Sequence, residues 1–372
     1  MVSYEKYSRK ISIGTNSSCN LRCVYCYERD KKGNVLDVEL IKKRLIDVLA
    51  QRTKYGTLLD LHGGEPFLVF KELKNLCEWI WSQNFKEDIM IHLTTNGTLV
   101  HGYIQDWLYR NRFRLWVKLS LDGNKSAHNL NRSNSFDLID IPFFVKTWPH
   151  ERVKMTLTPQ TIVFLYDSIR FLHSSGFKNI SVDFAEITTD WSCEEIIKEF
   201  EAQMTYLVNF YILHKEYIPC SLFIVPFERL LSNNSINQFN WCSIGSKIAY
   251  DVDTNKIYPC HLFFESVCGR EKSCLAQEID ISVKDNLVSK ECWDCKFIPI
   301  CPTCYGANLI ARGSLSSRDM NMCKIHKIRF RKVAEYEFLR IKELPNETSN
   351  NEKILNFRKV LAIRNILHLL YS

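Results

Sequence analysis

Residues 19–27 read CNLRCVYCY, and this stretch decides how the rest of the sequence is interpreted. It follows an apolar, strand-like segment over Lys10–Thr15. Its cysteines, Cys19, Cys23 and Cys26, have the spacing C-x3-C-x2-C. Thiolates are soft ligands, so three of them in one short loop can hold one face of a cubane iron–sulfur cluster. Three protein ligands leave one iron open, and an open position is typical of a catalytic metal site.

A half zinc site and a chance grouping are the alternatives for such a stretch. Its position directly after a strand, with the aromatic Tyr25 before the third cysteine, argues against chance. The first 14 residues, MVSYEKYSRKISIG, lack the apolar core of a signal peptide, and no apolar run approaches a membrane span. We therefore expect a cytoplasmic protein with no membrane partner. In that reducing compartment the 15 cysteines indicate metal or redox chemistry rather than disulfides.

Length and composition fit a globular protein with one large and one smaller domain. The chain has 372 residues, of which 46% are hydrophobic and 24% charged. The net charge of +7 comes from scattered residues. It permits an anionic cofactor or an acidic peptide partner, and it does not favour nucleic acid.

Six strand-like segments alternate with amphipathic segments of helical length. Six strand–helix units in series predict an α/β fold with a parallel sheet and outer helices. Six units are too few for a closed eight-stranded barrel, so we expect a partial (β/α)6 barrel with one open side. The strand-like segments are Lys10–Thr15, Leu58–Gly64, Met90–Gly97, Arg114–Gly123, Val153–Pro159 and Ile180–Glu186.

The expected domains are the barrel (1–215), a bridge (216–240) with the polar run Ser232–Asn240, a small cysteine-rich domain (241–330) and a helical tail (331–372). Nine cysteines fall between Trp241 and Ile325, where long periodic helices are absent. We expect metal, rather than a hydrophobic core, to hold that domain together. The tail pattern breaks at Pro345–Asn351 and resumes through Leu369.

Polar motifs follow the predicted strands. HGGEP occupies 62–66, TTNG occupies 94–97, and SLDG occupies 120–123, with His128 and Arg132 beyond it. Taken singly, these motifs also describe a turn, a hairpin and a helix cap. Their order at successive strand ends favours one active-site face, because active sites of parallel barrels lie at the carboxyl ends of the strands.

With these motifs in order, the chain resembles the radical SAM superfamily over roughly residues 10–330. The resemblance implies a 4Fe–4S cluster on Cys19, Cys23 and Cys26 as the catalytic loop. It also implies that S-adenosylmethionine (SAM) chelates the open iron and is cleaved to a 5′-deoxyadenosyl radical. Such chemistry belongs to the cofactor, which the protein positions.

The resemblance also implies a set of cofactor-binding residues. The GGEP motif would bind the SAM amino group, and its glycines let the backbone approach a ligand closely. Ser120 and Arg132 would contact the methionyl and ribose ends of SAM, and an arginine suits a bidentate grip on a carboxylate. Ile180 would pack on the adenine. The full set is Tyr25, Gly63, Gly64, Glu65, Asn96, Ser120, Asp122, Arg132 and Ile180.

The C-terminal cysteines resemble the SPASM domain that follows many radical SAM barrels. Asn255 stands where that family has glycine, and Cys304 follows its predecessor after two residues rather than three. The resemblance implies two auxiliary clusters. The distal ligands would be Cys292, Cys295, Cys301 and Cys323, and the proximal ligands Cys242, Cys260 and Cys304.

The fourth proximal ligand stays open. Fully ligated members have a further cysteine shortly after the first, but residues 246–250 contain none. Either Cys268 or Cys274 returns to the cluster, or one iron is open to substrate. A zinc ribbon, and hence a zinc-dependent binding protein, is the rival interpretation; the upstream motifs favour iron. Cys77, Cys193 and Cys220 have the simplest interpretation as small hydrophobic residues.

Barrels with such a domain mainly modify peptides. The resemblance implies a maturase that forms a cross-link (C–C, C–S or C–O) or an oxidised residue in a ribosomally made precursor, with flavodoxin or ferredoxin as reductant. The alternative is an anaerobic sulfatase-maturing, formylglycine-forming enzyme. There an Asp base follows the second SPASM cysteine, whereas this chain has His261, which can still accept a proton. The chain starts almost at the first strand, so we expect a separate leader-binding partner, or the basic tail in that role.

Overall fold

The computed structural model describes residues 7–28, 31, 37–50, 53–231, 242, 244, 248–251, 254–343 and 349–370. The polar run Ser232–Asn240 lies outside the described residues. Within the described ranges, no helix combines the length and the apolar character needed to cross a membrane.

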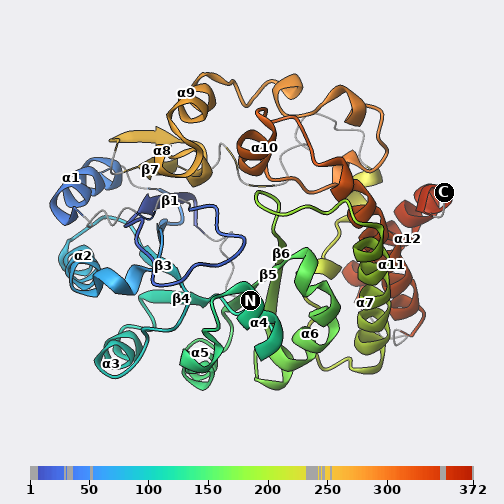
Figure 1. Cartoon of the computed structure of the whole chain (residues 1–372), viewed down its shortest axis with the longest axis horizontal. Coiled ribbons are helices and arrows are strands. Elements are labelled where there is room, and N and C mark those ends of the chain that lie inside the picture. The colour runs from blue at the N-terminus through green and yellow to red at the C-terminus, as the bar shows by residue number, and fades with distance from the viewer. Residues whose placement is uncertain are drawn as a thin grey trace.

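A partial barrel of six parallel strands forms the centre of the molecule, as expected (Figure 1). The Leu121 amide donates to the Lys154 carbonyl at 2.8 Å, and this single bridge joins the fourth strand to the fifth. Each predicted strand is found within a few residues of its expected start. The strands are β1 (Arg9–Gly14), β2 (Thr57–His62), β3 (Ile89–Thr95), β4 (Leu115–Leu119), β5 (Arg152–Leu157) and β6 (Asn179–Phe184).

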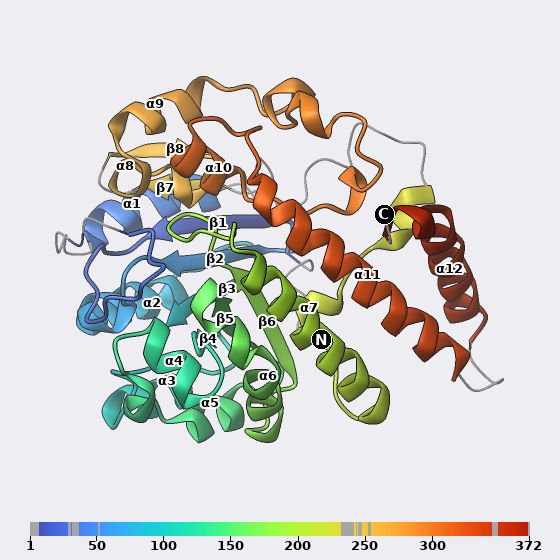
Figure 2. The ribbon, with the colours of Figure 1, turned by 45° about the vertical axis from the view of Figure 1, so that its right-hand side comes forward.

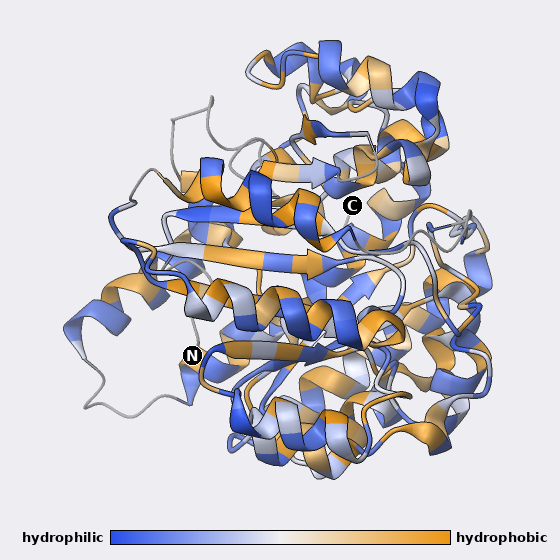
Figure 3. Ribbon diagram, turned by 90° about the vertical axis from the view of Figure 1, so that its left-hand side faces the viewer, coloured by the Kyte–Doolittle hydropathy of each residue, from blue (hydrophilic) through white to orange (hydrophobic). Residues whose placement is uncertain are grey.

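The strands are short, and hydrophobic residues are interspersed along them with polar ones (Figure 3). Alternation along β2 shows how one strand serves two surfaces, because successive side chains point to opposite faces. Leu59 and Leu61 are fully buried in the main core. Asp60 and His62 face a cavity inside the barrel.

Helices cover the outside of the barrel (Figure 1). The last of these helices, α7, is amphipathic, as expected of the segments between the strands. Its residues Phe200, Met204 and Leu207 are fully buried. The helices are α1 (Val38–Leu49), α2 (Phe70–Ser82), α3 (Tyr103–Arg110), α4 (Lys125–Asn131), α5 (Ile141–Thr147), α6 (Leu165–Ser174) and α7 (Glu194–Leu213). Short 3-10 helices also occur: η2 (Pro66–Val69), η3 (Phe136–Leu138), η4 (Pro159–Phe164), η5 (Ser221–Phe223), η6 (Phe227–Leu231), η7 (His261–Phe263), η8 (Lys284–Asn286), η9 (Lys290–Cys292) and η10 (Ile298–Ile300).

The cysteine-rich region begins with a hairpin that the sequence did not predict. Strand β7 (Ile248–Asp251) pairs parallel with β1, and β8 (Lys256–Tyr258) pairs antiparallel with β7. The barrel sheet therefore continues into this region. Three helices follow, α8 (Glu265–Cys268), α9 (Arg270–Glu278) and α10 (Tyr305–Arg312).

The expectation that this region lacks a hydrophobic core is wrong. A second cluster of buried apolar side chains forms there, separate from the barrel core. Tyr258, Phe263, Tyr305 and Leu309 are at most 1% exposed. The aromatic residues stand far apart in sequence, which is why no helical periodicity revealed this core.

Two long helices end the chain. Helix α11 (Met320–Lys342) packs along α7, and α12 (Asn350–Leu370) packs against α11 (Figure 2). The predicted break between them is confirmed, although residues 344–348 within it lie outside the described ranges. Cys323 lies in the first turn of α11. Its thiol is near those of Cys292 and Cys295 in the cysteine-rich region.

Candidate active site

A cavity of about 740 Å³ opens at the carboxyl ends of the barrel strands. Cys19, Cys23 and Cys26 line it on the barrel side. Cys242 and Cys304, from the cysteine-rich region, line the same cavity. The volume lies in the range that binds a small molecule or a side chain.

Backbone hydrogen bonds fix the cysteine loop to the end of α4. The Val24 amide donates to the Asn131 carbonyl at 3.0 Å, and the Arg22 amide donates to Ser133 Oγ at 2.9 Å. Ser133 has a positive φ of 54°, a conformation that non-glycine residues rarely adopt. The cysteine loop is therefore anchored to the end of α4 and to the strained turn that follows it.

Two side chains aim N–H groups at the loop sulfurs. Asn96 Nδ2 lies 3.9 Å from Cys19 Sγ, and Arg132 Nη1 lies 3.9 Å from Cys23 Sγ. Burial raises the pKa of both thiols. Coordination to a metal centre would favour their thiolate forms.

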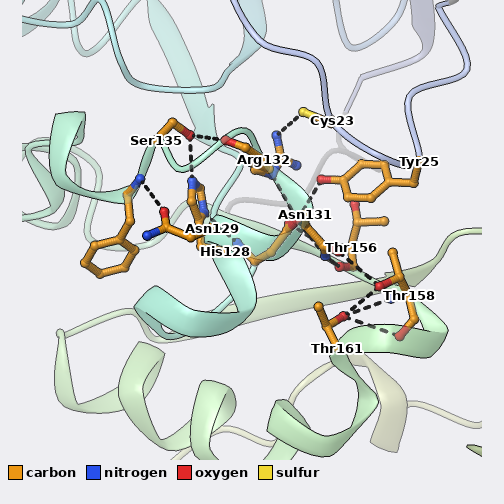
Figure 4. A network of polar contacts seen from close by, with 12 residues as sticks. Cys23, Tyr25, His128, Asn129, Asn131, Arg132, Ser135, Thr156, Thr158 and Thr161 are labelled. Carbon is orange, nitrogen blue, oxygen red and sulfur yellow. Dashed lines mark hydrogen bonds and ion pairs between the residues drawn. The ribbon is translucent and has the colours of Figure 1, made fainter.

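Tyr25, Asn131 and Arg132 lie close together behind the loop (Figure 4), and Asp122 connects them. Its fully buried carboxylate accepts hydrogen bonds from Tyr25 Oη at 2.8 Å and Asn131 Nδ2 at 3.1 Å. It also accepts from the Thr156 amide at 2.9 Å and pairs with Arg132 Nε at 3.0 Å. The Arg132 guanidinium lies 5.3 Å from the centre of the Tyr25 ring. Asp122 therefore positions the two residues expected to meet the cofactor.

The cofactor-binding role expected of Asp122 stays a prediction. In this structure Asp122 is buried behind Tyr25 and does not line the cavity. It does not cap the following helix either. Asn124 caps α4 and accepts a hydrogen bond from the Ala127 amide at 3.0 Å.

The glycines of the GGEP motif allow the backbone of Asn16 and Ser18 to approach closely. A Cβ on Gly63 would lie 2.2 Å from the Asn16 carbonyl oxygen, and one on Gly64 would lie 2.0 Å from that of Ser18. The Gly64 amide donates to Asn16 O at 2.9 Å, and the Glu65 amide donates to Ser18 O at 2.8 Å. Both glycines also line the cavity. The close approach that they permit is to the segment that leads into the cysteine loop.

Glu65 connects the GGEP motif to the TNG motif. Its buried carboxylate accepts hydrogen bonds from Thr95 Oγ1 at 2.7 Å and the Asn96 amide at 2.8 Å. Burial raises its pKa to about 7 against the effect of these donors. The carboxylate does not line the cavity, whereas the Asn96 side chain does. The expected role of Glu65 in binding the SAM amino group stays a prediction, and in this structure its carboxylate accepts these two hydrogen bonds.

Ser120 and Arg132 line the cavity, but Ile180 does not. Ile180 is buried in the main core near the amino end of β6. Val182, two residues closer to the carboxyl end, lines the cavity instead. Ile180 therefore lies nearer the amino end of β6 than Val182, and its expected contact with the adenine stays a prediction.

A cluster of histidines and one aspartate lies on the cavity wall beside His261. The rings of His62 and His261 are 4.1 Å apart, and His92 Nδ1 lies 2.7 Å from Asp60 Oδ1. Burial alone would raise the pKa of Asp60, but the hydrogen bond and charge of His92 hold it well below its usual range. Sequence reasoning missed Asp60, His62 and His92. The available signal was the polar residues that alternate with leucine in TLLDLH.

The structure brings together the cysteines expected to form the distal group. Burial raises the pKa of Cys301 to about 12, and the neighbouring thiols of Cys323, Cys295 and Cys292 contribute to that rise. Cys292 ends η9, and Cys301 follows η10 directly. Two short turns and the first turn of α11 therefore place these thiols.

The three expected proximal cysteines also lie near one another. Burial raises the pKa of Cys304, and Glu186, Cys260 and Cys242 raise it further. Cys304 caps α10 and accepts from the Ala307 amide at 3.4 Å.

The cysteine loop fits a cluster with an open iron. Three thiols border one cavity, two of them with N–H donors at their sulfurs, and the cavity has room for a further ligand of the iron. In the part of the chain that the structure describes, no three His, Cys, Asp or Glu side chains are arranged to hold a single metal ion.

Comparison with known proteins finds similarity in the N-terminal third of the chain. Residues 15–139 match the Radical SAM superfamily model. A cysteine-type anaerobic sulfatase-maturating enzyme of Clostridium perfringens is 33% identical over 128 residues, which cover 32% of this chain and 34% of that protein. A GTP 3′,8-cyclase of Campylobacter jejuni is 29% identical over 146 residues, covering 36% and 43%. The matched region thus spans between a third and a half of these relatives.

Solved structures share the fold over most of the chain. A histidine-tagged form of anSMEcpe with bound AdoMet matches with a TM-score of 0.69 and 20% identity, covering 95% of this chain and 99% of that one. Streptococcus suis SuiB bound to its precursor peptide SuiA matches with a TM-score of 0.57 and 18% identity, covering 85% and 76%.

Proposed function

We propose, from the premise that this chain carries a radical SAM domain, that it is a radical SAM/SPASM enzyme that modifies a side chain of a ribosomally made peptide. One observation carries the proposal. A single cavity is bordered by the three cysteines of the barrel loop, by two C-terminal cysteines and by His261. A side chain in that cavity would lie between a radical source and an electron acceptor.

Cys19, Cys23 and Cys26 would hold the first cluster, whose open iron binds SAM. When bound, this pair supplies a 5′-deoxyadenosyl radical that abstracts hydrogen from a substrate. The chain's own part is positioning. Asn96 and Arg132 orient the loop sulfurs, and Asp122 holds Arg132 in place.

His261 is proposed to accept the proton that the substrate loses. It lies on the cavity wall and packs against His62. His62 in turn lies near the charge of Asp60, which stabilises positive charge on this wall. His62 and Asp60 therefore act as positioning residues.

The C-terminal cysteines are proposed to hold two auxiliary clusters that take up an electron from the substrate. The domain boundaries 1–215, 216–240, 241–330 and 331–372 remain our proposal, with the sheet continuing across them through β7. Flavodoxin or ferredoxin would supply the electron that starts turnover. The precursor would bind through a separate leader-binding protein or the basic tail, in a reducing compartment that keeps the cysteines free as ligands.

Formylglycine formation is the second candidate. The similarity of 33% to sulfatase-maturating enzymes over 128 residues favours it. His261 in place of their expected aspartate base favours a precursor-peptide maturase.

The test is a peptide assay with the full chain, reconstituted without oxygen and supplied with SAM and a reductant. Short peptides encoded beside the gene and a Cys-containing sulfatase peptide are incubated in parallel. A mass change, with 5′-deoxyadenosine formed in step with it, supports the proposal. Conversion of the sulfatase peptide alone would establish the second candidate instead. SAM cleavage that no peptide stimulates would count against both.

A further inference from the structure

The proximal auxiliary group has three cysteines and an unassigned fourth position. The inference below rests on the proposed function, because it concerns the ligands of one proposed cluster. Cys242, Cys260 and Cys304 form the group. A cubane cluster has four irons, so one iron needs a further ligand or stays open.

The two spare cysteines of this region belong to a different neighbourhood. Cys268 ends α8, and Cys274 lies on α9. Burial raises the pKa of Cys268 to about 11, and the charged groups that shift it are Lys272, Glu265 and Cys274 itself. Both thiols therefore lie on the α8–α9 side of the region, whereas Cys304 begins α10.

Glu186 lies on the wall of the same cavity as two of the three proximal cysteines. It follows β6 by two residues, at the carboxyl end of the barrel, and lines the cavity together with Cys242 and Cys304. After burial, its carboxylate is the largest influence on the pKa of the Cys304 thiol, ahead of Cys260 and Cys242. The carboxylate is thus a close neighbour of the group.

The surroundings leave this carboxylate available. Among the described residues, none donates a hydrogen bond to it or pairs with it at salt-bridge distance. Burial raises its pKa to about 7, against the opposing effect of Arg312. The Glu186 side chain is partly buried, and coordination to a metal centre would stabilise its carboxylate there.

We propose that the carboxylate of Glu186 is the fourth protein ligand of the proximal auxiliary cluster, in place of a cysteine. The barrel would then supply one ligand and the C-terminal region three. A carboxylate has the same charge as the thiolate it replaces, and its oxygen is a harder ligand for iron. Closing this position would also keep the substrate off the proximal iron, so that the cluster acts on electrons alone.

The test uses a full-length background in which Cys19, Cys23 and Cys26 are all replaced by alanine, so that only auxiliary clusters assemble. Glu186→Gln and Glu186→Cys are compared with the unchanged residue. Asp183→Asn is the matched control, because Asp183 lines the same cavity but pairs with Lys154 at 3.6 Å. Cys268→Ala tests the rival cysteine. Iron content and the EPR spectrum are measured before and after mild oxidation with ferricyanide.

An iron without a protein ligand is lost on mild oxidation, which leaves a three-iron cluster with a distinct EPR signal. We expect Glu186→Gln to lose about one of about eight irons and to show that signal. All the irons should remain in the protein with Glu186 unchanged. The same holds for the variants Glu186→Cys, Asp183→Asn and Cys268→Ala. A stable cluster in Glu186→Gln, or an equal loss with Glu186 intact, would overturn the inference. Zinc in place of iron would instead overturn the proposed function.

Discussion

The two cysteine-bearing regions are built by different means. In the barrel, the loop Cys19–Cys26 is held by buried polar side chains, chiefly Asp122 and Glu65, which bind backbone amides and charged partners. In the C-terminal region, the cysteines stand at the ends of short helical turns over a small aromatic core. The comparison teaches that the barrel site is shaped by directional bonds and the auxiliary region by apolar packing.

The largest expected effect is on the cleavage of SAM, which is proposed to depend on the barrel cysteines. Cys23→Ala should abolish SAM cleavage, because it removes one of three ligands of the proposed catalytic cluster. The formation of 5′-deoxyadenosine, measured by liquid chromatography and mass spectrometry, should fall to background. Cys193→Ala, at an exposed cysteine, is the control and should retain activity. Retained cleavage in Cys23→Ala would remove the loop from the mechanism.

The next largest effect is on stability and tests the buried ion pair between Asp122 and Arg132. Asp122→Asn leaves the buried Arg132 without its counter-charge, and such a change costs about 3–5 kcal/mol of unfolding free energy. Urea unfolding measures it. Asp137→Asn breaks a surface pair with Lys125 at 2.6 Å and should cost less than about 1 kcal/mol. Equal losses in the two variants would show that the buried network does not shape the barrel site.

His261 lies between the two regions, and its replacement tests how they share one cavity. His261→Ala should lower the rate of peptide modification by about 100-fold, the usual scale for a lost proton acceptor. The KM for SAM should change little, because the loop is untouched. His101→Ala, on an exposed histidine, is the matched control. An unchanged rate in His261→Ala would assign proton transfer to another group.

Cys304→Ala should uncouple the two regions. The barrel would still cleave SAM, so 5′-deoxyadenosine formation should change by less than about threefold, while peptide product falls by at least about tenfold. Both are measured in the same reaction mixture. Equal losses of 5′-deoxyadenosine and product would mean that the C-terminal region also shapes the SAM site.

The smallest effect is a pH dependence of the barrel itself. Burial lowers the pKa of His173 to about 4, from about 6.5 in the unfolded chain. The unfolded state therefore binds the proton first, and this stability, complete above about pH 6.5, is lost as the pH falls toward 4. His173→Phe should remove up to about 1.4 kcal/mol per pH unit of this dependence. Parallel pH profiles of the variant and the unchanged protein in urea unfolding would contradict the shift.

The sequence predicted the barrel well because its signals are local. Short apolar runs, most of them ending in glycine or proline, located all the barrel strands, and the spacing of Cys19, Cys23 and Cys26 located the loop. The sequence predicted less about features that depend on how distant segments come together in three dimensions. Strands β7 and β8 have four and three residues, too few for a periodic signal. Ile180 and Val182 are equally apolar, and only their depth along β6 distinguishes them.

The polar groups that complete the site were beyond sequence reasoning for the same reason. Asp60 and His92 are register partners on neighbouring strands, and a pairing across strands cannot be read from either strand alone. Glu186 and Cys304 line the same cavity although more than a hundred residues of chain separate them. The C-terminal core is likewise assembled from residues far apart, so the region seemed to need metal alone.

The most direct test of the account is the metal content of the full chain purified without oxygen, measured together with the cleavage of SAM. The account predicts a brown protein with about twelve irons, for three cubane clusters, and 5′-deoxyadenosine formed after addition of a reductant. A colourless protein with stoichiometric zinc and no 5′-deoxyadenosine would contradict it.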